Sequence, residues 1–335
     1  MGQKSIISIS RRQFVQTLAP AGLALVLLPS GTKAQGQFPS KNLKLIVPYA
    51  AGGGTDAIAR LIAQAVGTVL GQTMIVENNG TAGGNLATQQ AASADKDGYT
   101  VLMANQGPMV VNPHLFKSVK VDMLKAFDPV SMIADAPLVV VVPKDSRFGS
   151  LQELVTFSQK NPDKLTYGSA GNGSASHLAV LLLATAAKFK AVHVPYRGAG
   201  PAINDLVGGN FDFMITTMPS IIGLMEAGTV RALAVTSKVR VTAFPVIPTV
   251  AELGWPDYET SAWYGFVVPA GVPKPVIEHL RSATVEAINT PALKERLIKE
   301  GATPLGSSPE EFAALLGKEH ARWGALIKET GLRHD

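Results

Sequence analysis

The chain contains no cysteine, and only 16% of its 335 residues are charged. The absence of cysteine excludes disulfide bonds, thiolate metal sites and cysteine nucleophiles. The six histidines share no metal-ligand spacing, and neither H-E-x-x-H nor G-x-S-x-G occurs. We therefore expect no metal, no cofactor and no catalytic residues. The 46% of hydrophobic residues are ample for a buried core in roughly two domains of about 150 residues each.

A basic face is also missing, although the formal net charge is +5. Four of the positive charges come from Lys4, Arg11, Arg12 and Lys33, and residues 1–34 contain no acidic residue. The rest of the chain therefore carries a net charge of +1, without a run of lysine or arginine that has interleaved aromatic residues. We expect no nucleic-acid partner.

Long hydrophobic runs are absent after the N-terminus. Within the N-terminal residues, "SRRQFVQ" (10–16) resembles a twin-arginine export signature, and an apolar segment follows it. Thr32 and Ala34 then provide the small residues that a signal peptidase requires. We predict that residues 1–34 are an export signal that is cleaved after Ala34. The apolar segment is too short to span a hydrocarbon core of roughly 30 Å, but an uncleaved anchor is the alternative.

Short β-branched runs alternate with amphipathic helical patterns along the rest of the chain. "LKLIVP" (43–48) is typical of a strand, and 55–70 has apolar residues at i, i+3, i+4 and i+7, which predicts a helix that starts at an N-cap Thr55. "PLVVVVP" (137–143) predicts a fully buried strand. The alternation indicates an α/β fold with mostly parallel sheets flanked by helices, in two similar lobes.

Loops rich in glycine, serine, threonine and asparagine follow the predicted strands. Ligands of open parallel sheets bind beyond the carboxyl ends of the strands. Glycine lets the backbone approach a ligand there, and the N–H groups at the start of each following helix attract an anion without an arginine. These loops predict a carboxylate or phosphate site; they are 50–56, 79–85, 105–108, 169–176, 197–201 and 216–220.

Two other interpretations of the first loop are possible. A phosphate-binding P-loop would need a lysine that the loop lacks. A dinucleotide fingerprint is matched literally by Gly52, Gly54 and Ala57, with Glu77 located 20 residues after Ala57, but "PYAA" separates the strand from the first glycine. A nicotinamide cofactor would also have to bind before export. These two points weaken the dinucleotide interpretation, so we keep an NAD-dependent enzyme only as an alternative.

Several polar residues have both a functional and a structural interpretation. A Ser–His pair could form from Ser169 or Ser174 with His177, which would suit a hydrolase. His177 alternatively lies in the first turn of its helix and shapes the pocket. Asp56 could be a ligand contact, a general base or a residue that supports the helix start. Tyr49 is an expected pocket wall or a rim aromatic.

Read together, these stretches resemble the periplasmic solute-binding receptors of tripartite tricarboxylate transporters, the Bug receptors. The resemblance covers nearly the whole chain after the signal and is carried by 47–60, 76–85, 97–105, 167–179, 193–212, 231–237, 247–254 and 263–276. The chain departs from the family pattern at Ala50, where proline is usual, at 79–81, where Arg-Pro-Gly is common, and at Leu181, where glutamate is common.

The resemblance implies a two-lobed periplasmic-binding-protein type II fold. Lobe 1 would comprise 38–137 plus about 235–335 and lobe 2 would comprise 138–234, with hinge strands near 137–142 and 231–236. It also implies an extracytoplasmic receptor, not an enzyme, that passes a small carboxylate to a membrane permease. The alternatives are an NAD-dependent or Ser174-based enzyme and a ligand sensor that docks a signalling protein.

The same resemblance implies the ligand contacts. They are Tyr49, Gly54, Thr55, Asp56, Gly83, Gly84, Asn85, Asn105, Gln106, Ser169, Gly173, Ser174, His177 and Thr216. The ligand class stays open among monocarboxylates, dicarboxylates, amino acids and aromatic acids.

Overall fold

The structure of the chain is a computed structural model that describes residue 2 and residues 38–331. From Pro39 onward the chain forms one compact unit. Apart from residue 2, the predicted export signal lies outside the described residues. No helix in the described part of the chain is both long and apolar enough to cross a membrane.

The N-terminal part of this unit has the β-α-β-α-β order that the sequence predicts. Its elements are β1 (Leu43–Val47), α1 (Gly54–Leu70), β2 (Met74–Asn78), η1 (Thr81–Gly84), α2 (Asn85–Ala92), β3 (Thr100–Ala104), the π-helical turn η2 (Gly107–Val111), α3 (Asn112–Leu115) and α4 (Met123–Ala126). Strand β1 pairs in parallel with both β2 and β3. The carboxyl ends of all three strands therefore meet at one edge.

The remaining elements continue the alternation. They are β4 (Phe127–Pro143), α5 (Leu151–Lys160), β5 (Thr166–Ser169), α6 (Ala175–Ala187), β6 (Val192–Pro195), α7 (Ala199–Val207), β7 (Phe213–Thr217), α8 (Met218–Glu226), β8 (Val230–Val235), β9 (Ser261–Pro269), α9 (Lys274–Asn289), α10 (Pro291–Lys299), β10 (Thr303–Pro304) and α11 (Pro309–Thr330). Strand β5 pairs in parallel with β6 and β7, so a second set of strand ends is also aligned.

The long strand β4 joins the two sets of strands. Its first part, Phe127–Pro137, pairs antiparallel with β9, and its last part, Leu138–Pro143, pairs antiparallel with β7 and β8. The resulting strand order is β2-β1-β3-β9-β4-β7-β5-β6. The sequence predicts only the last seven residues of β4 as a strand, because the polar residues of its first part hide the extended conformation.

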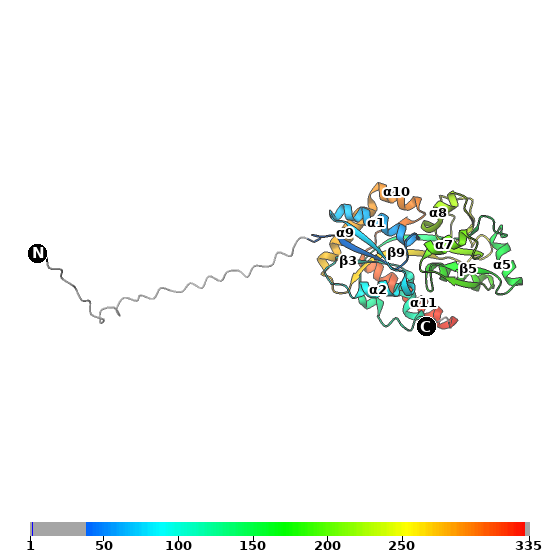
Figure 1. Cartoon of the computed structure of the whole chain (residues 1–335), viewed down its shortest axis with the longest axis horizontal. Coiled ribbons are helices and arrows are strands. Elements are labelled where there is room, and N and C mark those ends of the chain that lie inside the picture. The colour runs from blue at the N-terminus through cyan, green and yellow to red at the C-terminus, as the bar shows by residue number, and fades with distance from the viewer. Residues whose placement is uncertain (1, 3–37, 332–335) are drawn as a thin grey trace. The chain divides into compact units, whose positions relative to one another are not determined.

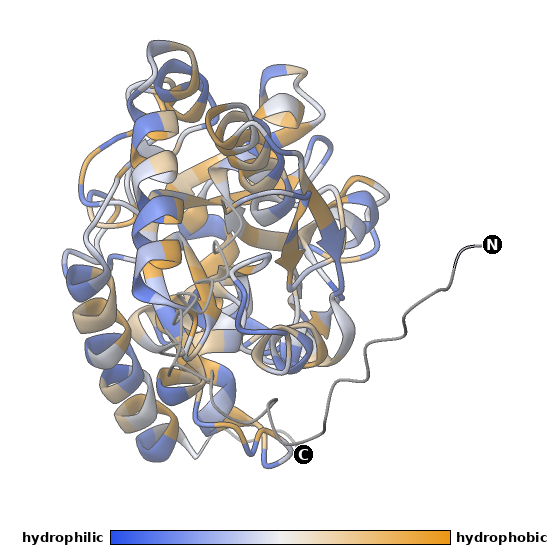
Figure 2. Ribbon diagram, turned by 90° about the vertical axis from the view of Figure 1, so that its left-hand side faces the viewer, coloured by the Kyte–Doolittle hydropathy of each residue, from blue (hydrophilic) through white to orange (hydrophobic). Residues whose placement is uncertain are grey.

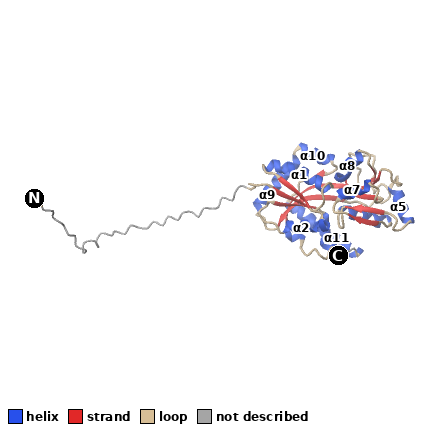
Figure 3. Cartoon of the chain, in the orientation of Figure 1, coloured by secondary structure: helices blue, strands red, loops and turns tan. Residues whose placement is uncertain are grey.

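Helices cover both faces of the sheet. In Figures 1 and 3, α1, α9 and α10 lie on one side of β3 and β9, and α2 and α11 lie on the other. Figure 2 shows hydrophobic residues concentrated along the inner strands, while the outer helices alternate between polar and apolar residues. This alternation is the pattern of helices that bury a single face.

The described residues include two large hydrophobic clusters. One surrounds Trp263, Phe312 and Trp323, and it draws on β3, β9, η2 and α11. The other contains Val139, Val141 and residues of α7, β7 and α8. The first cluster packs mainly around β3 and β9, and the second packs around β4 and β7.

Candidate functional site

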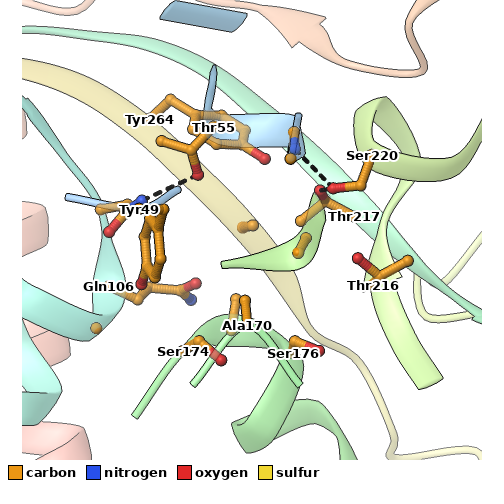
Figure 4. Close-up of a pocket in the computed structure, with 17 residues that line it drawn as sticks. Tyr49, Thr55, Gln106, Ala170, Ser174, Ser176, Thr216, Thr217, Ser220 and Tyr264 are labelled. Atoms are coloured by element: carbon orange, nitrogen blue, oxygen red, sulfur yellow. Dashed lines mark hydrogen bonds between the residues drawn. The ribbon is translucent and has the colours of Figure 1, made fainter. Parts of the chain in front are cut away.

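The candidate site is a small cavity to which both sets of strands contribute. The cavity volume is about 40 Å³, which is space for roughly three waters at about 10–15 Å³ each. Figure 4 shows the residues that line it. They are Tyr49, Gly53, Gly54, Thr55, Asn105, Gln106, Gly107, Ala170, Ser174, Ala175, Ser176, Ala199, Thr216, Thr217, Ser220, Ala262 and Tyr264.

Four helices begin at this cavity. The first residues of α1, α6 and α7 line it directly, and α8 contributes its N-cap Thr217 and Ser220 from its first turn. The free N–H groups at the start of a helix carry roughly half a positive charge in total. Among the described residues that line the cavity, none is Asp, Glu, Lys, Arg or His. The helix ends are therefore the main fixed source of positive potential in the cavity.

The start of α1 is capped from another part of the chain. The helix begins at Gly54 with Gly53 as its N-cap, so the predicted cap at Thr55 is wrong. The Gly54 N–H donates to Ser220 Oγ at 2.7 Å, and Ser220 Oγ lies 2.7 Å from Thr217 Oγ1. A β-carbon at position 54 would collide with both hydroxyls. Glycine is therefore required because the hydroxyls of α8 take the place of a side-chain cap.

The amides of Asn105 and Gln106 enter the cavity from the end of β3. Asn105 Nδ2 donates to Thr55 Oγ1 at 3.3 Å, and Gln106 Nε2 donates to the carbonyl of Ser261 at 3.0 Å. Both side chains are about 95% buried, and neither amide oxygen has a hydrogen-bond partner among the described residues. Two residues that line the cavity therefore have a buried amide oxygen with unused acceptor capacity.

Two tyrosines form aromatic walls of the cavity. Burial raises the pKa of Tyr49, and the neighbouring Tyr264 raises it further. Burial also raises the pKa of Tyr264, while the nearby Thr217 hydroxyl opposes that rise and the charge of Asp135 adds to it. Both phenols therefore stay protonated at neutral pH, so they add no negative charge that would repel an anion.

Seven of the predicted contact residues line the cavity together. They are Tyr49, Gly54, Thr55, Asn105, Gln106, Ser174 and Thr216. The other seven predicted contacts, Asp56, Gly83, Gly84, Asn85, Ser169, Gly173 and His177, are not in the lining. A binding role stays a prediction for both groups, but the second group has packing functions that the structure makes clear.

Asp56 belongs to a polar network beside the cavity. Its carboxylate accepts hydrogen bonds from the Gly52 N–H at 3.0 Å and from Asn78 at 3.0 Å, and it pairs with Arg60 at 3.0 Å. Burial by itself would raise the pKa of Asp56, but the bonds from Arg60, Gly52 and Asn78 bring it below its ordinary value. Its position in the first turn of α1 fits the structural interpretation.

Gly83, Gly84 and Asn85 hold the second loop against η2 and α3. Asn112 Nδ2 donates to the Gly83 carbonyl at 3.0 Å and to Asn85 Oδ1 at 2.6 Å. Gly84 has φ +86° and lies so close to Pro48 and Pro108 that a side chain would collide with them. These residues therefore fix the shape of the loop.

The contacts of Ser174, Ser169 and His177 fit a structural interpretation of these residues. Ser174 is the N-cap of α6: its Oγ donates to the Gly171 carbonyl at 2.6 Å and accepts from the His177 backbone N–H. His177 Nδ1 accepts from the Gly173 N–H at 3.2 Å. Ser169 Oγ instead lies 2.6 Å from Nε2 of His193, outside the cavity lining. A serine nucleophile facing the cavity therefore has no support from these contacts.

Several lining residues were not predicted. Thr217 and Ser220 lie in the loop "TTMPS" (216–220). The sequence predicts this loop as part of the site, but only Thr216 in it is a predicted contact. Tyr264 and Ala262 lie on β9, which joins the sheet antiparallel to β3 and β4. No local pattern tells which side chains of that strand face a cavity formed by much earlier segments of the chain, so the sequence carried no signal for them.

The chain is similar to known proteins over nearly its whole length. The sequence pattern of the tripartite tricarboxylate transporter family receptor matches residues 58–332. A protein encoded in the tcbD-tcbE intergenic region of Pseudomonas sp. strain P51 is 39% identical over 330 residues, which are 98% of this chain and 96% of that protein.

Solved structures of related proteins share the fold. The periplasmic binding protein BugD has a TM-score of 0.85 at 34% identity, with 89% of this chain and 100% of BugD covered. MatC from Rhodopseudomonas palustris with bound malate has a TM-score of 0.82 at 31% identity, covering 87% and 100%. An R. palustris protein with adipate has a TM-score of 0.85 at 32% identity, covering 88% and 98%.

Proposed function

Because the chain belongs to the tripartite tricarboxylate transporter receptor family, we propose that it is an extracytoplasmic receptor that captures a small organic carboxylate and delivers it to a membrane permease. The malate and adipate in two solved relatives support a carboxylate as the ligand class. The periplasmic nature of BugD supports a periplasmic location after removal of residues 1–34. The proposal that a membrane permease is the partner rests on the family alone.

The observation that carries this proposal is the meeting of four helix N-termini at one cavity without a charged side chain. Backbone N–H groups and hydroxyls can bind a carboxylate there, and each charge-assisted hydrogen bond contributes about 1.5–3 kcal/mol. After the cost of association is subtracted, we expect a binding free energy of about −8 kcal/mol, which corresponds to a micromolar dissociation constant.

Main-chain contacts close the cavity between the two sets of strands. The Ala50 N–H donates to the Arg197 carbonyl at 2.9 Å. A β-carbon at Gly200 would lie 2.5 Å from the Ala51 carbonyl oxygen, and one at Gly53 would lie 3.1 Å from the β-carbon of Ala199. In our proposal this arrangement is the closed form, and the lobes 38–137 plus about 235–335 and 138–234 open about β4 and β8 to admit the ligand.

Other contacts around the cavity argue against the enzyme alternatives. A dinucleotide would need the backbone at Gly54 to face a pyrophosphate, but Thr217 and Ser220 occupy that space. A hydrolase would need a Ser174 hydroxyl that is paired with a ring nitrogen, but this hydroxyl caps α6. We therefore propose that the protein binds its ligand without turning it over.

Calorimetric titration of the mature chain tests the proposal. Mono- and dicarboxylates should bind with one site per chain, and the melting temperature should rise with ligand concentration as the binding free energy requires. Mass spectrometry of the recovered acid should show it unchanged. Steady conversion of the acid into a product, or a lack of binding to every carboxylate, would contradict it. Co-purification with the permease distinguishes a transport receptor from a sensor.

A further inference from the structure

The side chain of Gln106 has a fixed orientation in the cavity. Its Nε2 donates to the Ser261 carbonyl at 3.0 Å. Because a backbone carbonyl can only accept, the amide cannot be turned around without losing this bond. Its Oε1 therefore stays the free end of the amide, and it has no partner among the described residues. Figure 4 shows this side chain extending toward the cavity.

Asn105 does not impose the same constraint. Its amide contacts the Thr55 hydroxyl, which can either donate or accept. Asn105 can therefore present its N–H₂ group or its oxygen to a ligand, whereas Gln106 can present only an acceptor. A buried acceptor without a donor is unfavourable, so a ligand that supplies one is preferred.

A carboxylate cannot supply this donor, because both of its oxygens are acceptors at neutral pH. The donor must be a second group of the ligand, either a hydroxyl or an ammonium. An ammonium brings three N–H donors and a positive charge. Among the described residues, no acidic side chain lines the cavity, and both Asp56 oxygens are bonded to Gly52, Arg60 and Asn78. A hydroxyl, with its single donor, fits better.

We propose that Gln106 selects hydroxycarboxylates: Oε1 of Gln106 accepts the ligand's hydroxyl while the helix N-termini bind its carboxylate. This inference rests on the receptor function proposed above and specifies its substrate class. The fold alone leaves this choice open, since one solved relative holds malate, which has a hydroxyl, and another holds adipate, which has none. The selection therefore depends on individual cavity residues.

Matched pairs of acids test the inference. The mature chain is titrated with malate against succinate and with lactate against propionate, which differ by one hydroxyl. At least one hydroxy acid should bind about tenfold to a hundredfold more tightly than its partner, because the deoxy acid leaves Oε1 without a donor. This comparison uses the wild-type chain, so it does not depend on whether any variant folds.

Variants then assign the effect to Gln106. Gln106→Met removes the acceptor at similar size, and the ratio of the two affinities should fall to about one. Gln106→Glu keeps an acceptor, so its ratio should still favour the hydroxy acid even if both acids bind more weakly. Gln64→Met, on the exposed side of α1, is the matched control and should keep the wild-type ratio.

Each outcome decides between the two proposals. If no acid binds, the receptor proposal fails and the inference fails with it. If acids bind but the wild-type ratio is about one, a water satisfies Gln106, and the inference alone is wrong. It is also wrong if Gln106→Met keeps the wild-type ratio, or if amino acids bind more tightly than hydroxy acids.

Discussion

Replacing Gly200 with alanine should separate ligand affinity from stability. Gly200 lies in the first turn of α7, and its φ is not in the positive region. An added β-carbon would lie 2.5 Å from the Ala51 carbonyl oxygen and 3.2 Å from the carbonyl carbon of Gly52. Both atoms belong to the other proposed lobe. The substitution therefore interferes with the closed form and leaves the open form free of the collision.

The two effects have opposite signs. Alanine is favoured over glycine within a helix by about 0.5–1 kcal/mol, so the ligand-free protein should melt at the wild-type temperature or up to about 3 °C higher. Crowding of this kind costs about 1–3 kcal/mol. Since closure is coupled to binding, the dissociation constant should rise about fivefold to 150-fold.

Calorimetry with the best-bound acid and melting of the ligand-free chain measure the two quantities. Gly317→Ala in α11 is the control, because its β-carbon would meet no atom within 4 Å; it should give a similar stability gain and unchanged affinity. Small-angle scattering of the ligand-saturated Gly200→Ala variant should show a larger radius of gyration than wild type. Wild-type affinity in this variant, or a drop in its melting temperature that matches the lost affinity, would contradict the proposed closed form.

Asp56→Ala should lower the free energy of unfolding by about 1–2 kcal/mol and change ligand affinity less than threefold in calorimetry, because Asp56 does not line the cavity; an abolished affinity would make it a ligand contact. Burial raises the pKa of Asp135 to about 6, the Ser261 hydroxyl lowers it, and Glu259 and Glu319 raise it. The folded state therefore binds more protons than the unfolded state, so wild-type stability should fall as the pH rises from about 4 to 6. Asp135→Asn should remove that fall and be about 1–3 kcal/mol more stable than wild type at pH 7.5 in urea melts; an equal pH slope in both chains would contradict the assignment. Intact-mass measurement of periplasmic protein should find Gln35 as the first residue, and replacing Arg11 and Arg12 with lysine should keep the chain in the cytoplasm; unchanged export would rule out the twin-arginine route.

Local sequence patterns determined the regular elements of this protein. The apolar spacing of 55–70 predicts α1 to within one residue. Such patterns work because one buried face imposes a period on the chain itself. The glycine and hydroxyl loops after the strands also showed where the cavity lies, since parallel strands bring their carboxyl ends to one edge.

Tertiary structure alone decided which residues of those loops face the cavity. Asp56 and Gly84 are in the right loops, but hydrogen bonds and close packing direct them to neighbouring segments. Tyr264 reaches the cavity only through the antiparallel pairing of β9, and Gln106 has a fixed orientation only because the carbonyl of Ser261, 155 residues later, accepts from it. A local pattern specifies a residue's own element, whereas a cavity is the meeting of distant elements whose contacts no single stretch encodes.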